Sequence, residues 1–208
     1  MRKKFDETDV RVLEDEDVFQ GYYRVRRLTL EHRRFAGGWS APVTRELFER
    51  GDAVGVLPWD VDRDELVLVE QFRPGALRTV DGVSGSPWML EIIAGIVEPG
   101  ETDTAVAHRE ASEEAGLTLL DLEPMVSFFP SPGACSEHVR LFVGRVDASS
   151  AAGLHGLEDE GEDIRVHRLS RHEAMALLDT NQISNGHTLM SLLWLCHYGD
   201  ALRQRWLT

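Results

Sequence analysis

Short apolar, β-prone runs recur along the chain and alternate with polar turns. Residues 53–57 and 65–71 are two such runs, and the segment 60–64 between them is an acidic turn, so we predict a hairpin. The same pattern predicts further strands around residues 21–30, around Val43, and over residues 88–96, 125–129 and 139–146. The chain therefore favours a structure in which strands predominate.

Helical periodicity is confined to three segments, residues 104–115, 170–178 and 187–206. Gly116 is placed to end the first helix, because glycine readily adopts the left-handed cap conformation. Ser170 followed by Glu173 is a capping-box pattern that opens the second helix. Strands that alternate with few helices predict a mixed α/β domain.

Two segments are predicted to be loops. Residues 73–87 are rich in Gly, Pro, Ser and Asp, and long loops of this kind often carry function. Residues 153–163 are acidic and punctuated by glycine, which predicts a mobile loop.

Charge and composition narrow the classes of partner. The net charge is −14 over 208 residues, so the average surface repels nucleic acid and anionic lipid, and we expect neither nucleic acid nor a membrane as partner. The opening residues MRKKFDETDV contain no apolar targeting segment, and no run approaches the roughly 20 apolar residues of a membrane span. We therefore expect a cytoplasmic protein. Cys135 and Cys196 are isolated, which disfavours a zinc site or a disulfide framework.

The first predicted helix carries three carboxylates on one face. Glu110, Glu113 and Glu114 stand at positions i, i+3 and i+4, and without a cation they would repel one another. Mg²⁺ prefers carboxylate oxygen ligands, and Arg109 is placed to orient the acids. In so acidic a chain, this triplet alone is more typical of a solvated helix face than of a metal site.

The wider segment, residues 95–117, changes that balance. It reads GIVEPGETDTAVAHREASEEAGL and matches G-x5-E-x7-R-E-U-x-E-E-x-G-U, where U is a bulky aliphatic residue. Seven fixed residues at fixed spacing would arise by chance in roughly one of 10⁵ to 10⁶ such chains. The segment resembles the Nudix box. Ala111 departs from the pattern, where a larger aliphatic residue is usual.

The resemblance extends over nearly the whole chain, to the bacterial ADP-ribose pyrophosphatase subfamily. Pro132 stands sixteen residues after Gly116, as in that subfamily. The segments VTRELFERG, VLVEQFRPGA, PWMLEIIAG, SFFPSPGACSE and GLEDEGEDIRVHRLS are also similar. The resemblance implies a Nudix fold over residues 51–208, an α/β/α sandwich with a mixed sheet. A small antiparallel β region over residues 1–50 would precede it and be exchanged between the protomers of a homodimer.

The resemblance also implies the catalytic and metal-binding residues. Glu160 would be the general base, with Arg109 and Glu113 also in the catalytic group. The metal ligands would be the backbone carbonyl of Ala94 and the carboxylates of Glu110, Glu113, Glu114 and Glu162. Without the resemblance, the acidic segment that contains Glu160 and Glu162 is more typical of a solvated loop.

The implied substrate contacts come from several segments. They are Tyr22, Tyr23, Arg45, Glu46, Arg50, Arg73, Ile96, Ser131, Pro132, Gly133 and Glu137. The two tyrosines would contact adenine, in part across the dimer interface, although they are equally suited to packing in the N-terminal sheet. Arg73 would reach phosphate, for which an arginine fork has suitable geometry. Ile96 is equally suited to the core.

The activity implied by the resemblance is Mg²⁺-dependent hydrolysis of ADP-ribose to AMP and ribose 5-phosphate. Two or three Mg²⁺ ions are expected, and Mn²⁺ can substitute for them. One alternative is hydrolysis of another nucleoside diphosphate sugar, such as a GDP or UDP hexose, because the box determines the diphosphate chemistry and not the base. A second alternative, from a different class, is an ADP-ribose sensor that has lost turnover.

Overall fold

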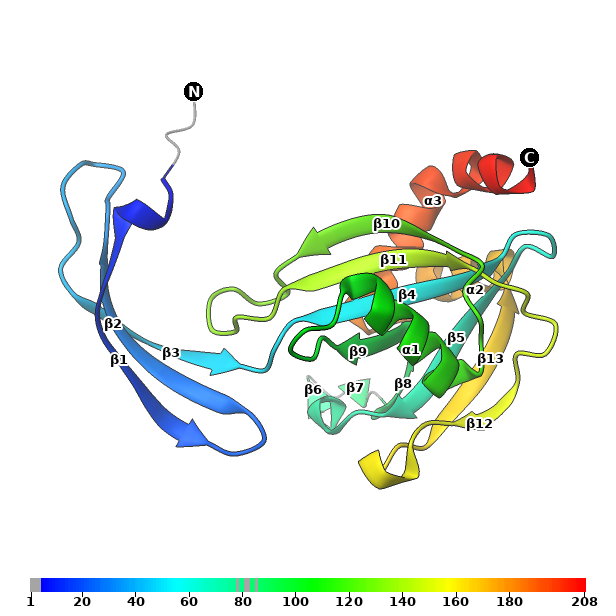
Figure 1. Cartoon of the computed structure of the whole chain (residues 1–208), viewed down its shortest axis with the longest axis horizontal. Helices are drawn as coiled ribbons and strands as arrows, with labels where there is room; N and C mark the ends of the chain where they lie inside the picture. The colour runs from blue at the N-terminus through cyan, green and yellow to red at the C-terminus, as the bar shows by residue number, and fades with distance from the viewer. Residues whose placement is uncertain (1–4, 78, 81–82, 85) are drawn as a thin grey trace. The chain divides into compact units, whose positions relative to one another are not determined.

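The computed structural model describes residues 5–77, 79–80, 83–84 and 86–208 (Figure 1). Parts of two predictions lie outside these residues, namely the first four positions of the N-terminal segment and residues 78, 81, 82 and 85 of the predicted loop. Contacts divide the chain into two compact units. The first comprises Met1–Asp52 and Phe129–His138, and the second comprises Ala53–Phe128 and Val139–Thr208. The division at residue 50 stays a prediction about domains.

The first unit contains a three-stranded antiparallel sheet. Its elements are the 3-10 turn η1 (Glu7–Asp9) and strands β1 (Val10–Gln20), β2 (Arg24–His32) and β3 (Val43–Glu49), in the order β1-β2-β3. β2 and β3 confirm the predicted strands, whereas β1 was missed because the acidic run at residues 14–17 breaks its apolar alternation. Those acids pair with arginines of β2: Arg27 lies 3.0 Å from Glu16, and Arg26 forms an ion pair with Asp15. The charged segment at residues 14–17 thus lies in a strand, where its acids pair with side chains of the neighbouring strand.

The second unit is built on an eight-stranded mixed sheet. Its strands are β4 (Ala53–Asp60), β5 (Glu65–Phe72), β8 (Trp88–Glu91), β9 (Ile93–Ile96), β10 (Asp121–Phe128), β11 (Val139–Arg145), β12 (Gly153–His155) and β13 (Ile164–Ser170). The main order is β10-β11-β4-β5-β13-β12, while β8 pairs with β5 and β9 with β4. Only the β11–β4 pair is parallel among the described strands. The β4–β5 pair confirms the predicted hairpin.

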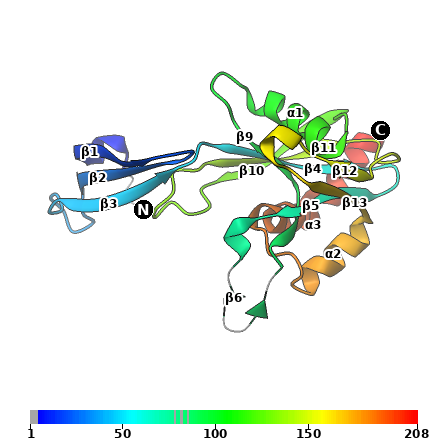
Figure 2. The same ribbon diagram turned by 90° about the horizontal axis from the view of Figure 1, so that it is seen from below.

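Three helices cover the two faces of this sheet. They are α1 (Asp103–Ala115), α2 (Arg171–Asp179) and α3 (Gly186–Leu207). α1 lies on one face, and α2 and α3 lie on the other (Figure 2). Alternate residues of β5 face the two cores: Val67 and Val69 pack towards α1, and Leu66 and Leu68 towards α2 and α3. The expected α/β/α sandwich is confirmed.

The helix ends follow the sequence signals. Gly116 caps α1 with φ of 63°, and Ser170 and Glu173 form the predicted capping box of α2. The side chain of Asn185 accepts from the amide of Thr188 at the start of α3. No helix in the described part of the chain is long and apolar enough to cross a membrane.

The predicted loops and one predicted strand differ in detail from the structure. The segment 73–87 contains a 3-10 turn, η2 (Pro74–Ala76), and the paired short strands β6 (Thr79–Val80) and β7 (Val83–Ser84). The predicted strand 88–96 is two strands that break at Ile92, whose amide donates to the Thr188 hydroxyl at 2.9 Å. The acidic loop begins with β12 and contains the 3-10 turn η3 (Glu158–Glu160).

Candidate functional site

The acids of α1 are held against strand β9 by close contacts. A Cβ atom at Gly95 would lie 1.6 Å from Oε1 of Glu110, so only glycine leaves room for this carboxylate. Oε2 of Glu114 accepts from the Ala94 amide at 3.2 Å. Ala111 is fully buried in the core cluster that α1 shares with the sheet. The local contacts therefore fix both carboxylates beside the Ala94–Gly95 backbone.

Burial and mutual repulsion disfavour negative charge at these acids. Glu114 is 2% exposed, and burial, together with the nearby charge of Glu110, raises its pKa to about 8. Burial likewise raises the pKa of Glu110, more than the neighbouring Arg109 lowers it. Glu162, from the acidic loop, adds a further repulsive charge to both. The three carboxylates thus lie close enough for the charges of Glu110 and Glu162 both to act on Glu114.

Arg109 binds three acids of the box helix and of the loop before it. Its Nε and Nη2 donate to the two oxygens of Glu101 at 3.1 and 3.2 Å. Its Nη1 donates to Glu110 at 2.7 Å and to Glu113 at 3.0 Å. The guanidinium therefore joins the loop before α1 to the acidic face of the helix, as its expected orienting role requires.

The acidic loop folds back on itself next to the end of α1. Oε2 of Glu162 accepts from the Leu157 amide at 3.0 Å, which fixes that carboxylate within the loop. Glu160 ends the turn η3 and is exposed. The structure thus brings Glu162 near Glu110 and Glu114 and leaves Glu160 exposed to solvent, and the role of Glu160 as general base stays a prediction.

A divalent cation fits the chemistry of this donor set. Among the described residues, no three His, Cys, Asp or Glu side chains are arranged to bind one ion directly. Instead, Glu110 is shared with the Arg109 guanidinium. The fit rests on Glu110, Glu114 and Glu162, because the other two carboxylates repel the buried Glu114 and a hard cation with oxygen ligands would relieve that repulsion.

Arg73 lies near Glu114 and Glu162, and it is held by Glu91, a residue that the sequence analysis did not single out. Glu91 is 3% exposed, and its Oε2 accepts from Nε of Arg73 at 2.9 Å, while its Oε1 accepts from Asn185. Burial opposes the charge of Arg73, yet its pKa is raised by Glu91 and further by the charges of Glu114 and Glu162. The one signal for Glu91 was a single acid inside the apolar run WMLEIIAG.

The tyrosines and the charged residues of β3 belong to the first unit. Tyr22 is 87% exposed, and its ring lies edge-on to that of Tyr23, with centroids 4.8 Å apart. Tyr23 also packs against Phe48 at 5.0 Å, so the expected packing role applies to it. Arg45 donates to its neighbour's carbonyl, and Glu46 accepts from a β2 arginine at 3.2 Å.

Two predicted substrate contacts in this unit form an ion pair with each other. Nη1 of Arg50 lies 3.1 Å from Oε1 of Glu137, which is buried. The exposed residues Ser131, Pro132 and Gly133 form a turn in which the Ser131 carbonyl accepts from the Cys135 amide at 3.0 Å. In the second unit, the Ile96 carbonyl accepts weakly from Arg109 at 3.4 Å. Roles in substrate binding stay predictions for all of these residues.

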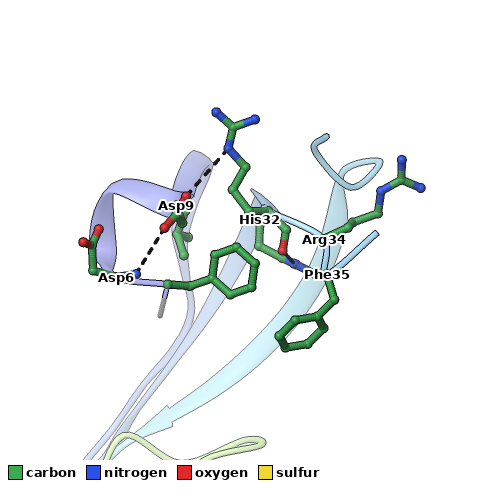
Figure 3. Close-up of a pocket in the computed structure, with 8 residues that line it drawn as sticks. Asp6, Asp9, His32, Arg34 and Phe35 are labelled. Carbon is green, nitrogen blue, oxygen red and sulfur yellow. Dashed lines mark hydrogen bonds and ion pairs between the residues drawn. The ribbon is translucent and has the colours of Figure 1, made fainter. Parts of the chain in front are cut away.

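A separate hollow of about 350 Å³ lies in the first unit (Figure 3). Its lining includes Phe5 and Phe35, whose ring centroids are 5.2 Å apart, and Asp9, which pairs with Arg33 at 3.7 Å. None of the residues predicted for the site lines it.

A sequence model of the NUDIX domain matches residues 49–191. The chain is 44% identical to an ADP-ribose pyrophosphatase of Escherichia coli strain K12, covering 97% of this chain and 95% of the relative. It is 40% identical to an ADP-ribose pyrophosphatase of Haemophilus influenzae, covering 97% and 93%. A GDP-mannose pyrophosphatase of Citrobacter koseri is 27% identical, covering 89% and 94%.

A solved structure shares the fold. It is described as an ADP compounds hydrolase and superposes with a TM-score of 0.71 at 21% identity, covering 97% of this chain and 98% of that chain. Together with the box helix and its acids, the matched domain and the full-length relatives show that the chain belongs to the Nudix family.

Proposed function

We propose that the protein hydrolyses the diphosphate bond of ADP-ribose, with Mg²⁺, to AMP and ribose 5-phosphate. The observation that carries the proposal is the buried carboxylate pair Glu110 and Glu114 beside Arg73, within the chain's similarity to ADP-ribose pyrophosphatases. Glu110, Glu114, Glu162 and the Ala94 carbonyl, with Glu113 as a further ligand, would hold two or three Mg²⁺ ions, for which Mn²⁺ could substitute. The cations would offset the diphosphate charge and stabilise the charge that develops during cleavage.

Within this proposal, the chain's own residues divide the work. Arg73 would bind a phosphate oxygen through its guanidinium fork, while Glu91 keeps it oriented. Glu160 would accept the proton of the attacking water, and its exposure leaves it free to approach the substrate. Arg109 would keep the acids of α1 in place.

We also propose that the protein is a cytoplasmic homodimer that pairs through its N-terminal sheet. β1 is an edge strand exposed along its whole length, and it carries the exposed apolar residues Val12, Leu13 and Phe19. An exposed edge strand that carries apolar side chains is typical of a protein interface. Sedimentation should give about twice the chain mass of 23.4 kDa, whereas a mass of one chain would contradict the dimer.

Two other activities remain candidates. The first is hydrolysis of another nucleoside diphosphate sugar by the same acids. The chain's similarity to a GDP-mannose pyrophosphatase is the reason to test it. The second is binding of ADP-ribose without turnover, as in a sensor. The chain retains every acid of the box as well as Glu160, which argues against loss of turnover.

The test is product release from ADP-ribose, ADP-glucose, GDP-mannose, UDP-glucose and NADH, each with Mg²⁺ and with EDTA. We expect AMP from ADP-ribose to form fastest, and EDTA to abolish it, because hydrolysis needs the cation at the carboxylates. Detection specific to each nucleotide product keeps the substrates comparable.

Two results would overturn the proposal in different ways. Faster turnover of GDP-mannose or UDP-glucose would keep the diphosphate chemistry and overturn the choice of base. Binding of ADP-ribose without turnover, with Mg²⁺ present, would favour the sensor.

A further inference from the structure

The acidic loop is attached to the C-terminal end of α1 by a backbone hydrogen bond. The Gly156 amide donates to the Glu113 carbonyl at 3.2 Å. The last carbonyls of a helix have no partner within the helix, and the amides of Gly116 and Leu117 turn back to earlier carbonyls. Gly156 therefore satisfies a carbonyl that the helix cap leaves over, and it ties the loop to the box helix.

The side chain of His155 strengthens this attachment. A Cβ atom at Gly116 would lie 2.9 Å from Cε1 of His155, so the imidazole packs directly on the backbone of the helix cap. Nε2 of His155 lies 3.1 Å from the Ala152 carbonyl oxygen. A carbonyl can only accept, so Nε2 donates, and this hydrogen bond fixes the plane of the ring. His155 is thus held by the Gly116 backbone and by the Ala152 carbonyl.

Beyond His155, the loop closes on itself around the predicted base. Gly156 has φ of 98°, and a Cβ atom there would lie 2.7 Å from Cβ of Glu162. The Leu157 amide donates to the Glu162 carboxylate, and the Leu157 carbonyl accepts from the Glu160 amide at 3.1 Å. The position of Glu160 therefore follows from where residues 155–157 are fixed.

We propose that His155 is a positioning residue, whose imidazole locks the acidic loop onto the Gly116 cap of α1 so that Glu160 is delivered to the substrate. This inference rests on the role proposed for Glu160. His155 acts through the loop and contacts neither substrate nor reacting atoms. A purely structural role would predict loss of stability without a selective loss of kcat.

The experiment compares His155→Ala, His155→Phe and the control His172→Ala, which removes an exposed histidine of α2. With ADP-ribose and Mg²⁺, we expect kcat of His155→Ala to fall about tenfold to a hundredfold, with KM within about twofold, because the base is misplaced while binding persists. His155→Phe keeps a ring on Gly116 and should retain more kcat than His155→Ala. The control should match the wild type.

Amide hydrogen exchange without substrate gives a readout that does not depend on activity. The Gly156 and Leu157 amides should exchange faster in His155→Ala, and the melting temperature should show that the rest of the fold persists. If His155→Ala melts below the assay temperature, the test compares kcat and amide exchange of His155→Phe with those of the control.

Three results would overturn the role of His155. They are a kcat of His155→Ala equal to that of the control, a loss explained by KM alone, and unchanged exchange at Gly156 and Leu157. If the wild type does not turn over ADP-ribose, the proposed function fails separately. In that case, faster exchange still supports the anchoring of the loop by His155, and unchanged exchange overturns it.

Discussion

Replacing Glu114 by glutamine should reduce turnover of ADP-ribose roughly a thousandfold, because a divalent cation contributes several kcal/mol of charge stabilisation and each 1.36 kcal/mol is a factor of ten. The amide keeps the acceptor for the Ala94 amide, so the local geometry persists while one anionic ligand is lost. Steady-state kinetics across a Mg²⁺ titration measures this. The matched control is Glu98→Gln, an exposed acid in the loop before α1.

The same variant should be more stable than the wild type in EDTA at alkaline pH. The pKa of Glu114 rises from 4.5 in its ordinary state to about 8 in the fold, so between these values the folded state holds a proton that the unfolded state has released. The free energy of unfolding of the wild type therefore falls as pH rises, by on the order of 4 kcal/mol by about pH 8. Glutamine has no proton to lose and should not show this fall.

Denaturation of both proteins in EDTA at about pH 5 and about pH 8 separates two causes of inactivity. A Glu114→Gln protein that is stable at the higher pH but inactive has lost a ligand and not its fold. Unchanged turnover would refute the role of Glu114, and equal pH dependence in the two proteins would refute its buried, protonated state.

Replacing Glu160 by glutamine should lower kcat by about 10² to 10⁴, the usual contribution of a positioned general base, with little change in substrate affinity. Glu160 is exposed in the turn η3, so the substitution should leave the fold unchanged. kcat, and the affinity for ADP-ribose measured by calorimetry with Mg²⁺, test the two parts of this prediction.

Glu158→Gln is the matched control, because Glu158 begins the same turn and is also exposed. An equal loss in both variants would point to the general charge of the loop and not to a base. A Glu160→Gln enzyme with wild-type kcat would exclude Glu160 as the proton acceptor.

Features that depend on neighbours along the chain could be predicted from the amino-acid sequence. The helical repeat places Glu110, Glu113 and Glu114 on one face whatever surrounds them, and Gly116 ends the helix because glycine readily adopts the left-handed cap. The acidic turn at residues 60–64 likewise predicts its hairpin locally. These features could be predicted because the interactions that stabilise them lie within a few residues along the chain.

Features that join distant segments could not be predicted, because they depend on contacts formed when the chain folds. Glu91 binds Arg73, eighteen positions away in the chain, and Gly156 meets the end of α1. Strand β1 pairs with β2 along its backbone, and arginines of β2 pair with its acids, contacts that its own pattern hides. Burial of Glu114 depends on β9 as well as on its own helix. Local spacing thus identified the acids, whereas their pKa values and the loop anchor depend on contacts made only when the chain folds.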